Sequence, residues 1–109
     1  MSTLRITVLK RTADVDLIEE YMGEEVKGDR LAAPKCDHFE DGQEFILDDL
    51  AKVPEGFCAW AWSDMYKEIL SIATGGDMRP WVKHPGTAIA CCTDAYRPVV
   101  FKLERIEAE

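Results

Sequence analysis

The sequence predicts an α+β fold in which a small antiparallel or mixed sheet, or an open barrel, packs on one long helix. Apolar and polar residues alternate in short segments near both ends of the chain, and one long stretch between them has apolar residues at helical spacing. Strands and helices do not alternate as βαβ units would. The 109 residues suit one hydrophobic core, so we expect a single domain, 1–109.

The first third of the chain predicts one strand and one short helix. Residues 4–9 alternate as a half-buried strand does. Asp14 or Asp16 can then cap a helix that ends before Gly23. We expect residues 24–35, which are polar and hold Gly and Pro, to form a long loop.

Residues 57–74 form the clearest helix, because their apolar residues recur at i, i+3, i+4 and i+7 and Gly75-Gly76 follows. The expected core stripe is Trp62, Met65, Tyr66, Ile69, Leu70 and Ala73.

The other elements are short strands. Residues 36–47 predict hairpin-like strands around Asp41-Gly42, a strong tight-turn signal. Residues 87–92 and 99–106 predict a final hairpin whose turn lies at 94–98.

Charge and composition exclude several classes of partner. The net charge of −8 and the pI near 4.7 would repel a phosphate backbone or an anionic lipid surface. No run approaches the roughly 20 apolar residues of a membrane span, and no leader-like segment is visible. We therefore expect a cytoplasmic protein without a nucleic-acid or membrane partner, in which the four cysteines are free thiols, ligands or catalytic groups rather than disulfides.

The cysteines are the strongest hint of chemistry. Cys36, Cys58 and the pair Cys91-Cys92 are far apart in the chain, which suggests thiols gathered by folding. Cys58 opens the long helix, where the helix dipole and unpaired N–H groups favour a thiolate. The alternative is a small residue of the core. Neighbouring strand residues face opposite ways, and we expect Cys92 to join a site, on the face it shares with Asp94.

A metal site is a second interpretation of the same residues. Cys36, Cys58 and Cys92 could bind a soft metal, zinc or iron, with His38 or His84 as a fourth ligand. No C-x-x-C pair is present, which argues against this interpretation. Both histidines are also compatible with ordinary loop or surface positions.

The tryptophans suggest a binding surface. Trp60 lies roughly 160° around the helix from the core residue Trp62, so we expect it to face a pocket, a loop or a partner subunit. Trp60 and Trp81 are the candidate ligand-binding residues. Asp64 is one helical turn from Trp60 and is a candidate polar anchor or general base. The alternative is a loop-covered indole beside a solvated carboxylate.

Three stretches carry a family resemblance: Cys36 with Gly42-Gln-Glu-Phe45, Pro54-Glu-Gly-Phe-Cys-Ala-Trp-Ala-Trp-Ser-Asp64, and Gly86-Thr-Ala-Ile-Ala-Cys-Cys-Thr-Asp94 with the strand 97–102. Together they resemble small uncharacterised bacterial and archaeal proteins with scattered cysteines, over about two thirds of the chain. The resemblance implies that Cys36, Cys58, Cys92 and Asp94 belong together. It implies no particular reaction.

The leading functional hypothesis is a thiol-centred small-molecule or metal site, with Cys58, Asp64 and Asp94 as candidate catalytic residues. The rival is a non-catalytic binding or dimerisation module whose cysteines belong to the core. A redox sensor is a weaker third interpretation. Whether the protein is an enzyme stays open, and we expect a homodimer.

Overall fold

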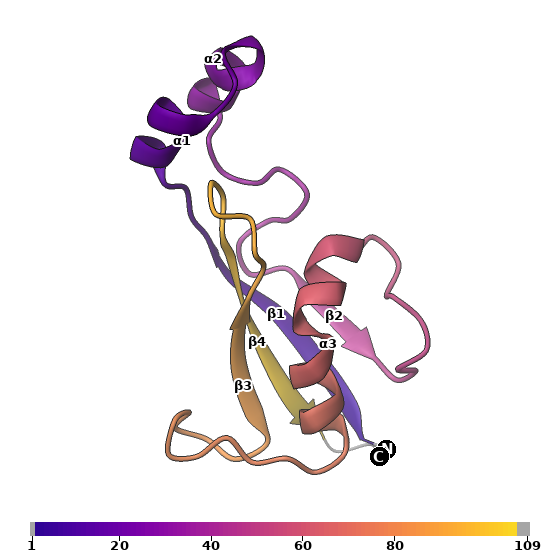
Figure 1. Cartoon of the computed structure of the whole chain (residues 1–109). Helices are drawn as coiled ribbons and strands as arrows, with labels where there is room; N and C mark the ends of the chain where they lie inside the picture. Colours follow the sequence, from indigo (N-terminus) through magenta and orange to yellow (C-terminus); the bar gives the residue numbers. More distant parts are fainter. Residues whose placement is uncertain (1, 107–109) are drawn as a thin grey trace.

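A computed structural model describes residues 2–106. Its strands form one antiparallel open sheet in the order β2-β1-β4-β3, and α3 packs across one face (Figure 1). The elements in chain order are β1 (Thr3–Arg11), α1 (Val15–Tyr21), α2 (Glu24–Ala32), β2 (Glu44–Leu47), α3 (Ala59–Ala73), β3 (Thr87–Cys91) and β4 (Val99–Ile106). This confirms the α+β class. Within residues 2–106, no helix has both the length and the apolar character needed to cross a bilayer.

The core lies between the sheet and α3. Each strand contributes alternate residues, and the fully buried ones include Leu4, Ile6, Val8, Val99, Phe101 and Leu103. The helix contributes a stripe that differs from the predicted one, because Ala61 and Ile72 are buried whereas Leu70 is exposed. Tyr66 is exposed as well, and its hydroxyl donates a hydrogen bond to the Leu50 carbonyl at 3.2 Å. Ala61 adds little bulk, so the helix can approach the sheet closely on that side.

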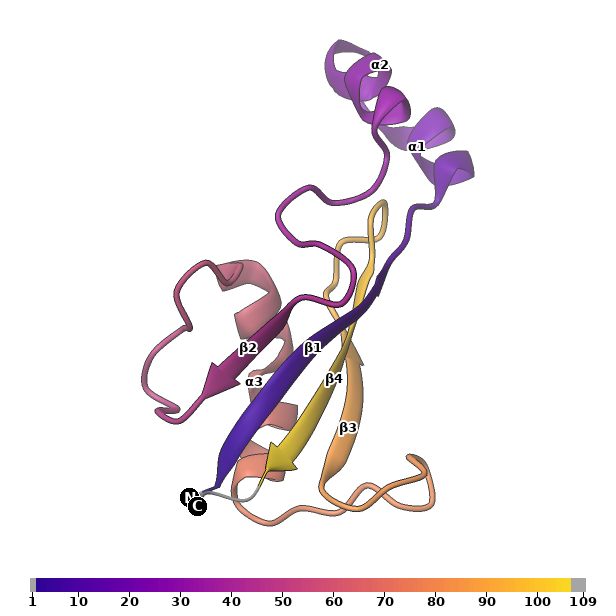
Figure 2. The ribbon, with the colours of Figure 1, turned by 180° about the vertical axis from the view of Figure 1, so that it is seen from behind.

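The prediction of a loop over 24–35 was wrong, because residues 24–32 form the helix α2. Glu24 and Glu25 lie in its first turn, where acidic side chains favour a helix, and most of its residues have good helix propensity. None of its residues is buried, so the sequence carries no apolar stripe that would reveal it. With α1, it forms a helical arm that projects beyond the sheet (Figures 1 and 2).

The predicted tight turn is present at Asp41-Gly42, where Gly42 has a φ of +83°. No strand precedes this turn, however, and β2 pairs with β1 instead of forming a local hairpin. The side chain and main chain of Arg11 both donate to Asp41 Oδ1, which fixes the turn against the end of β1. The predicted final hairpin is confirmed by the pairing of β3 with β4.

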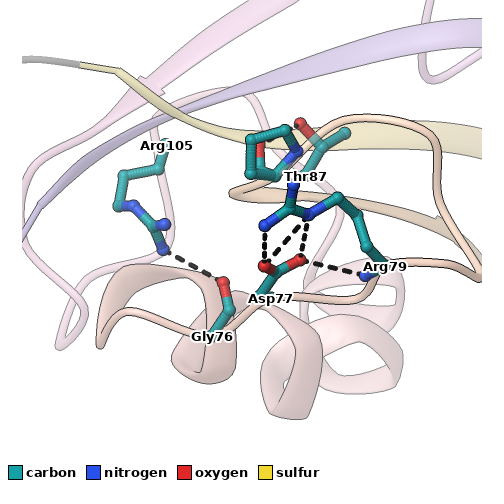
Figure 3. A network of polar contacts seen from close by, with 6 residues as sticks. Gly76, Asp77, Arg79, Thr87 and Arg105 are labelled. Atoms are coloured by element: carbon teal, nitrogen blue, oxygen red, sulfur yellow. Dashed lines mark hydrogen bonds and ion pairs between the residues drawn. The ribbon is translucent and has the colours of Figure 1, made fainter.

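Polar contacts close the C-terminal end of α3 (Figure 3). Arg105 Nη1, from the end of β4, donates to the carbonyls of Ile72 at 2.7 Å and Gly76 at 3.2 Å. The Ile72 carbonyl also accepts from the Gly75 N–H at 3.3 Å, so Arg105 adds a second donor there and places a cation at the negative end of the helix dipole. Asp77 and Arg79 form an ion pair in the following loop.

Candidate functional site

A cavity of about 740 Å³ lies at the opposite end of α3, between the start of that helix, α1 and the turn that joins β3 to β4. Cys36, Cys58 and Cys92 all line this cavity, although they come from three segments far apart in the chain. Each of the three is half-buried. The structure therefore brings together the three thiols that the sequence singled out.

Most of the cavity wall is apolar. Four aromatic side chains supply much of it, Tyr21 from α1, Phe39, Trp60 from α3, and Tyr96 from the β3–β4 turn. Leu17, Ala61 and Val99 add aliphatic surface. The volume falls within the range of small-molecule sites, which are mainly apolar with a few polar groups.

A chain of hydrogen bonds holds Trp60 in this wall. Trp60 Nε1 donates to Thr93 Oγ1 at 2.9 Å, and the Thr93 hydroxyl donates in turn to Asp64 at 3.0 Å. Asp64 Oδ2 also accepts from the Thr93 main-chain N–H at 2.8 Å. Asp64 thus ties α3 to the residue after Cys92 and is itself outside the cavity lining. Its contacts are those of a positioning residue.

Asp94 and Arg97 are the charged residues that line the cavity, and they bind each other. Arg97 Nε donates to Asp94 Oδ2 at 3.1 Å, while Asp94 Oδ1 accepts from the main-chain N–H groups of Tyr96 and Arg97. The carboxylate therefore shapes the turn, as well as facing the cavity. Because its charge is balanced by Arg97, the lining carries no net formal charge at neutral pH.

The thiols differ in their surroundings. Cys58 occupies the N-cap of α3 but its side chain makes no capping hydrogen bond. Cys92 Sγ accepts a long contact of 3.4 Å from the Val99 N–H. Cys91 is exposed on the other side of β3, and its S–H group donates a hydrogen bond to the Cys92 carbonyl. Partial burial of its sulfur, followed by the proximity of Cys92 and Asp64, raises the pKa of the Cys91 thiol.

Several sequence-predicted site residues lie elsewhere. Trp81 lines a separate hollow beside Ile89, because the loop that holds it follows the far end of α3. His38 and His84 do not line the cavity, and His38 Nε2 is 3.1 Å from the Gly56 carbonyl oxygen instead.

We expected that Cys36, Cys58 and Cys92 could bind zinc or iron, but their arrangement does not fit a metal site. Across residues 2–106, no group of three or more His, Cys, Asp or Glu side chains is arranged to hold a metal ion. Sharing a cavity wall is a weaker condition than pointing at one centre, which tetrahedral coordination requires.

Sequence reasoning missed part of the lining, namely Leu17, Tyr21, Phe39 and Tyr96. The first two lie on a short amphipathic helix that looked like an ordinary core helix. Tyr96 lies between Asp94 and Pro98 in a turn. An aromatic residue in a turn was the one feature of the sequence that could have indicated a lining residue there.

Comparisons with protein-family models, with curated proteins and with solved structures found no significant match to this chain. The resemblance to small cysteine-containing bacterial and archaeal proteins therefore stays a prediction.

Proposed function

We propose that the cavity binds an uncharged, largely apolar small molecule and that the Cys58 thiol is the reactive group in contact with it. The observation that carries this proposal is the gathering of three distant cysteines in one aromatic-lined cavity. Cys36, Cys58 and Cys92 pack against the edge of the hydrophobic core, but each stays half-buried and also lines the cavity, whereas a residue that only fills a core is buried fully. This favours a site over the rival module with core cysteines.

The lining supports the class of ligand. Tyr21, Phe39, Trp60 and Tyr96 offer ring surfaces to a planar apolar group. An anionic or cationic ligand would need an unpaired opposite charge in the wall, but Asp94 and Arg97 neutralise each other. The thiols are left to orient an uncharged ligand.

Cys58 is the best placed of the thiols. It stands at the start of a 15-residue helix whose packing on the sheet fixes its position, whereas Cys36 belongs to an irregular segment. The sulfur of Cys92 is engaged by the Val99 N–H. Four unpaired cysteines also suit a reducing compartment, and we propose a cytoplasmic location.

Competition between two thiol reagents tests this proposal. N-phenylmaleimide is uncharged and aromatic, and iodoacetate is an anion; the modification rate of each cysteine is followed by peptide mass spectrometry. For each cysteine, we compare the modification rate with N-phenylmaleimide to the rate with iodoacetate. We expect this ratio to be about tenfold higher at Cys58 than at Cys91, because the cavity buries the phenyl ring. Equal preferences at Cys58 and Cys91 would contradict the proposal.

A matched pair of tryptophan variants serves as the control. Trp60→Ala removes a wall of the cavity and should reduce the preference at Cys58. Trp81→Ala removes the same side chain from a position that is 93% exposed and outside the cavity, so it should leave the preference unchanged. If Trp81→Ala reduced it as much as Trp60→Ala, the cavity would not be the cause.

A further inference from the structure

The outer edge of β3 has free main-chain groups. Hydrogen bonds from Arg105 N to Gly86 O (2.8 Å) and from Cys92 N to Val99 O (3.1 Å) flank the β3–β4 pairing. Since bonded pairs alternate along an antiparallel ladder, Ala88 and Ala90 turn their main chain toward β4. The N–H and C=O groups of Thr87, Ile89 and Cys91 therefore point away from the sheet. Thr87 is only 8% exposed, so the accessible part of this edge runs over Ile89 and Cys91. No helix or strand of the described chain lies beyond them (Figures 1 and 2).

This edge has few of the devices that usually prevent strand pairing, although the loop that holds Met78, Trp81 and Val82 lies beside Ala88 and Ile89. The sequence Thr-Ala-Ile-Ala-Cys of β3 has no charged residue and no proline, and Ile89 is 49% exposed. The nearby flank of α3 carries Lys67 and Glu68, which form an ion pair at 3.3 Å and so add no net charge. The β3 edge and this flank therefore add nothing to the chain's net charge of −8.

The opposite edge of the sheet is protected. Arg5 lies 3.9 Å from Glu44 of β2 and balances its charge, but Asp48 and Asp49, which follow β2 directly, carry two further negative charges at this edge. Two copies meeting at β2 would bring like charges together, which disfavours pairing. The difference in charge therefore selects β3 over β2 as the edge at which two copies of this acidic chain can meet.

We propose that two copies of the chain form a homodimer by antiparallel pairing of β3 with β3 of the second copy. With Ile89 on the two-fold axis, the outward N–H and C=O groups of Ile89 face those of Ile89 in the second copy. Thr87 then lies opposite Cys91 of that copy, and the bonds between the two Ile89 residues are the ones that join accessible groups on both copies. The pairing joins the two sheets into one continuous sheet and covers the exposed Ile89 side chains.

Proline substitution at the two edges tests the proposal by analytical ultracentrifugation. Ile89→Pro removes an outward N–H, which leaves the bonds within the chain intact, and should convert a dimer of twice 12.3 kDa to a monomer. Ile46→Pro is the matched control. The bond from Val8 N to Gln43 O and the β1–β2 register turn the Ile46 N–H outward too, so this variant should stay dimeric. A monomeric wild type, or a dimer that Ile46→Pro alone disrupts, would overturn the proposal.

Cross-linking gives a second test that does not depend on how proline is tolerated. Residues directly opposite in a bonded antiparallel pair have Cα atoms about 5.5 Å apart, within disulfide range. Ile89→Cys should therefore give a covalent dimer under mild oxidation. The wild type should not, because Cys91 lies about 14 Å from Cys91 of the second copy in this register. Ile46→Cys is the control at the other edge. No covalent dimer from Ile89→Cys, or equal yields from all three proteins, would contradict the proposed register.

Discussion

Asp64 illustrates what one carboxylate does in this structure. The sequence suggested that Asp64 is a polar anchor or a general base. In the structure, its carboxylate oxygens accept hydrogen bonds from the Thr93 hydroxyl and main-chain N–H. Through Thr93, the same carboxylate fixes the Trp60 indole. A residue that touches no part of the cavity can therefore determine the shape of its wall.

Asp77 gives a pH prediction at the scale of one residue. Hydrogen bonds from the Arg79 side chain and main chain lower the pKa of Asp77 from 3.8 to about 2 (Figure 3). Because the folded-state pKa is the lower one, the ionised carboxylate stabilises the fold fully above pH 3.8, and this contribution is lost as the pH falls through about 2.

A carboxyl NMR titration should place the midpoint of Asp77 near pH 2, and Arg79→Gln should raise it toward 3.8. Correspondingly, the stability difference between the wild type and Asp77→Asn should shrink between pH 4 and pH 2. A midpoint that does not respond to Arg79→Gln would show that Arg79 is not the cause.

At the scale of elements, the arm formed by α1 and α2 is the least secured part of the described chain. Ile18 is its one buried side chain, and α2 buries none. The base of the arm is held by hydrogen bonds from Thr12 N to Pro98 O and from Asp14 N to Tyr96 O. Since Leu17 and Tyr21 of α1 line the cavity, movement of this arm would change access to Cys58.

Gly28→Ala should stabilise α2. Gly28 lies inside the helix, its φ is not positive, and an added Cβ would meet open space. Alanine should favour the helix by about 0.5–1 kcal/mol, so amide hydrogen exchange in residues 24–32 should slow by about two- to fivefold with α3 unchanged. Gly42→Ala is the opposite control. Its φ of +83° strains any other residue, and the protein should become less stable.

For the molecule as a whole, an aromatic cluster joins the sheet to the start of α3. The centroid of the Phe39 ring lies 5.2 Å from the ring centroids of Phe57 and Phe101 and 5.9 Å from that of Phe45. All three pairs are packed edge to face. Phe39 and the cysteines share the cavity wall, so the core and the candidate site meet at one layer of side chains.

Phe101→Ala should destabilise the protein by about 3–5 kcal/mol, because this fully buried side chain leaves a cavity at the centre of the cluster. Urea unfolding followed by circular dichroism measures the change. Trp81→Ala deletes a larger side chain that is almost wholly exposed, and its free energy of unfolding should stay within about 0.5 kcal/mol of the wild type. A comparable loss in both variants would mean that the cluster is not the main source of stability.

The local features could be predicted from the sequence alone. Alternation predicted β1, β3 and β4, and helical spacing predicted α3. Asp14 and Asp16 were the two candidate caps of α1, and Asp14 is the one whose side chain accepts a hydrogen bond from Leu17 N, at 3.1 Å. These features depend on neighbours a few residues away, and the sequence displays them directly. Helix α2 escaped prediction because it buries no side chain and so shows no pattern.

Which residues share the candidate site depends on packing between distant segments of the chain. The sequence proposed that Cys36, Cys58 and Cys92 meet, but it could not show that Tyr96 and Tyr21 join them or that Trp81 lies elsewhere. Those positions depend on how α3 crosses the sheet and on how the base of the arm is held beside the β3–β4 turn. Both are set by long-range packing, which no local pattern in the chain records.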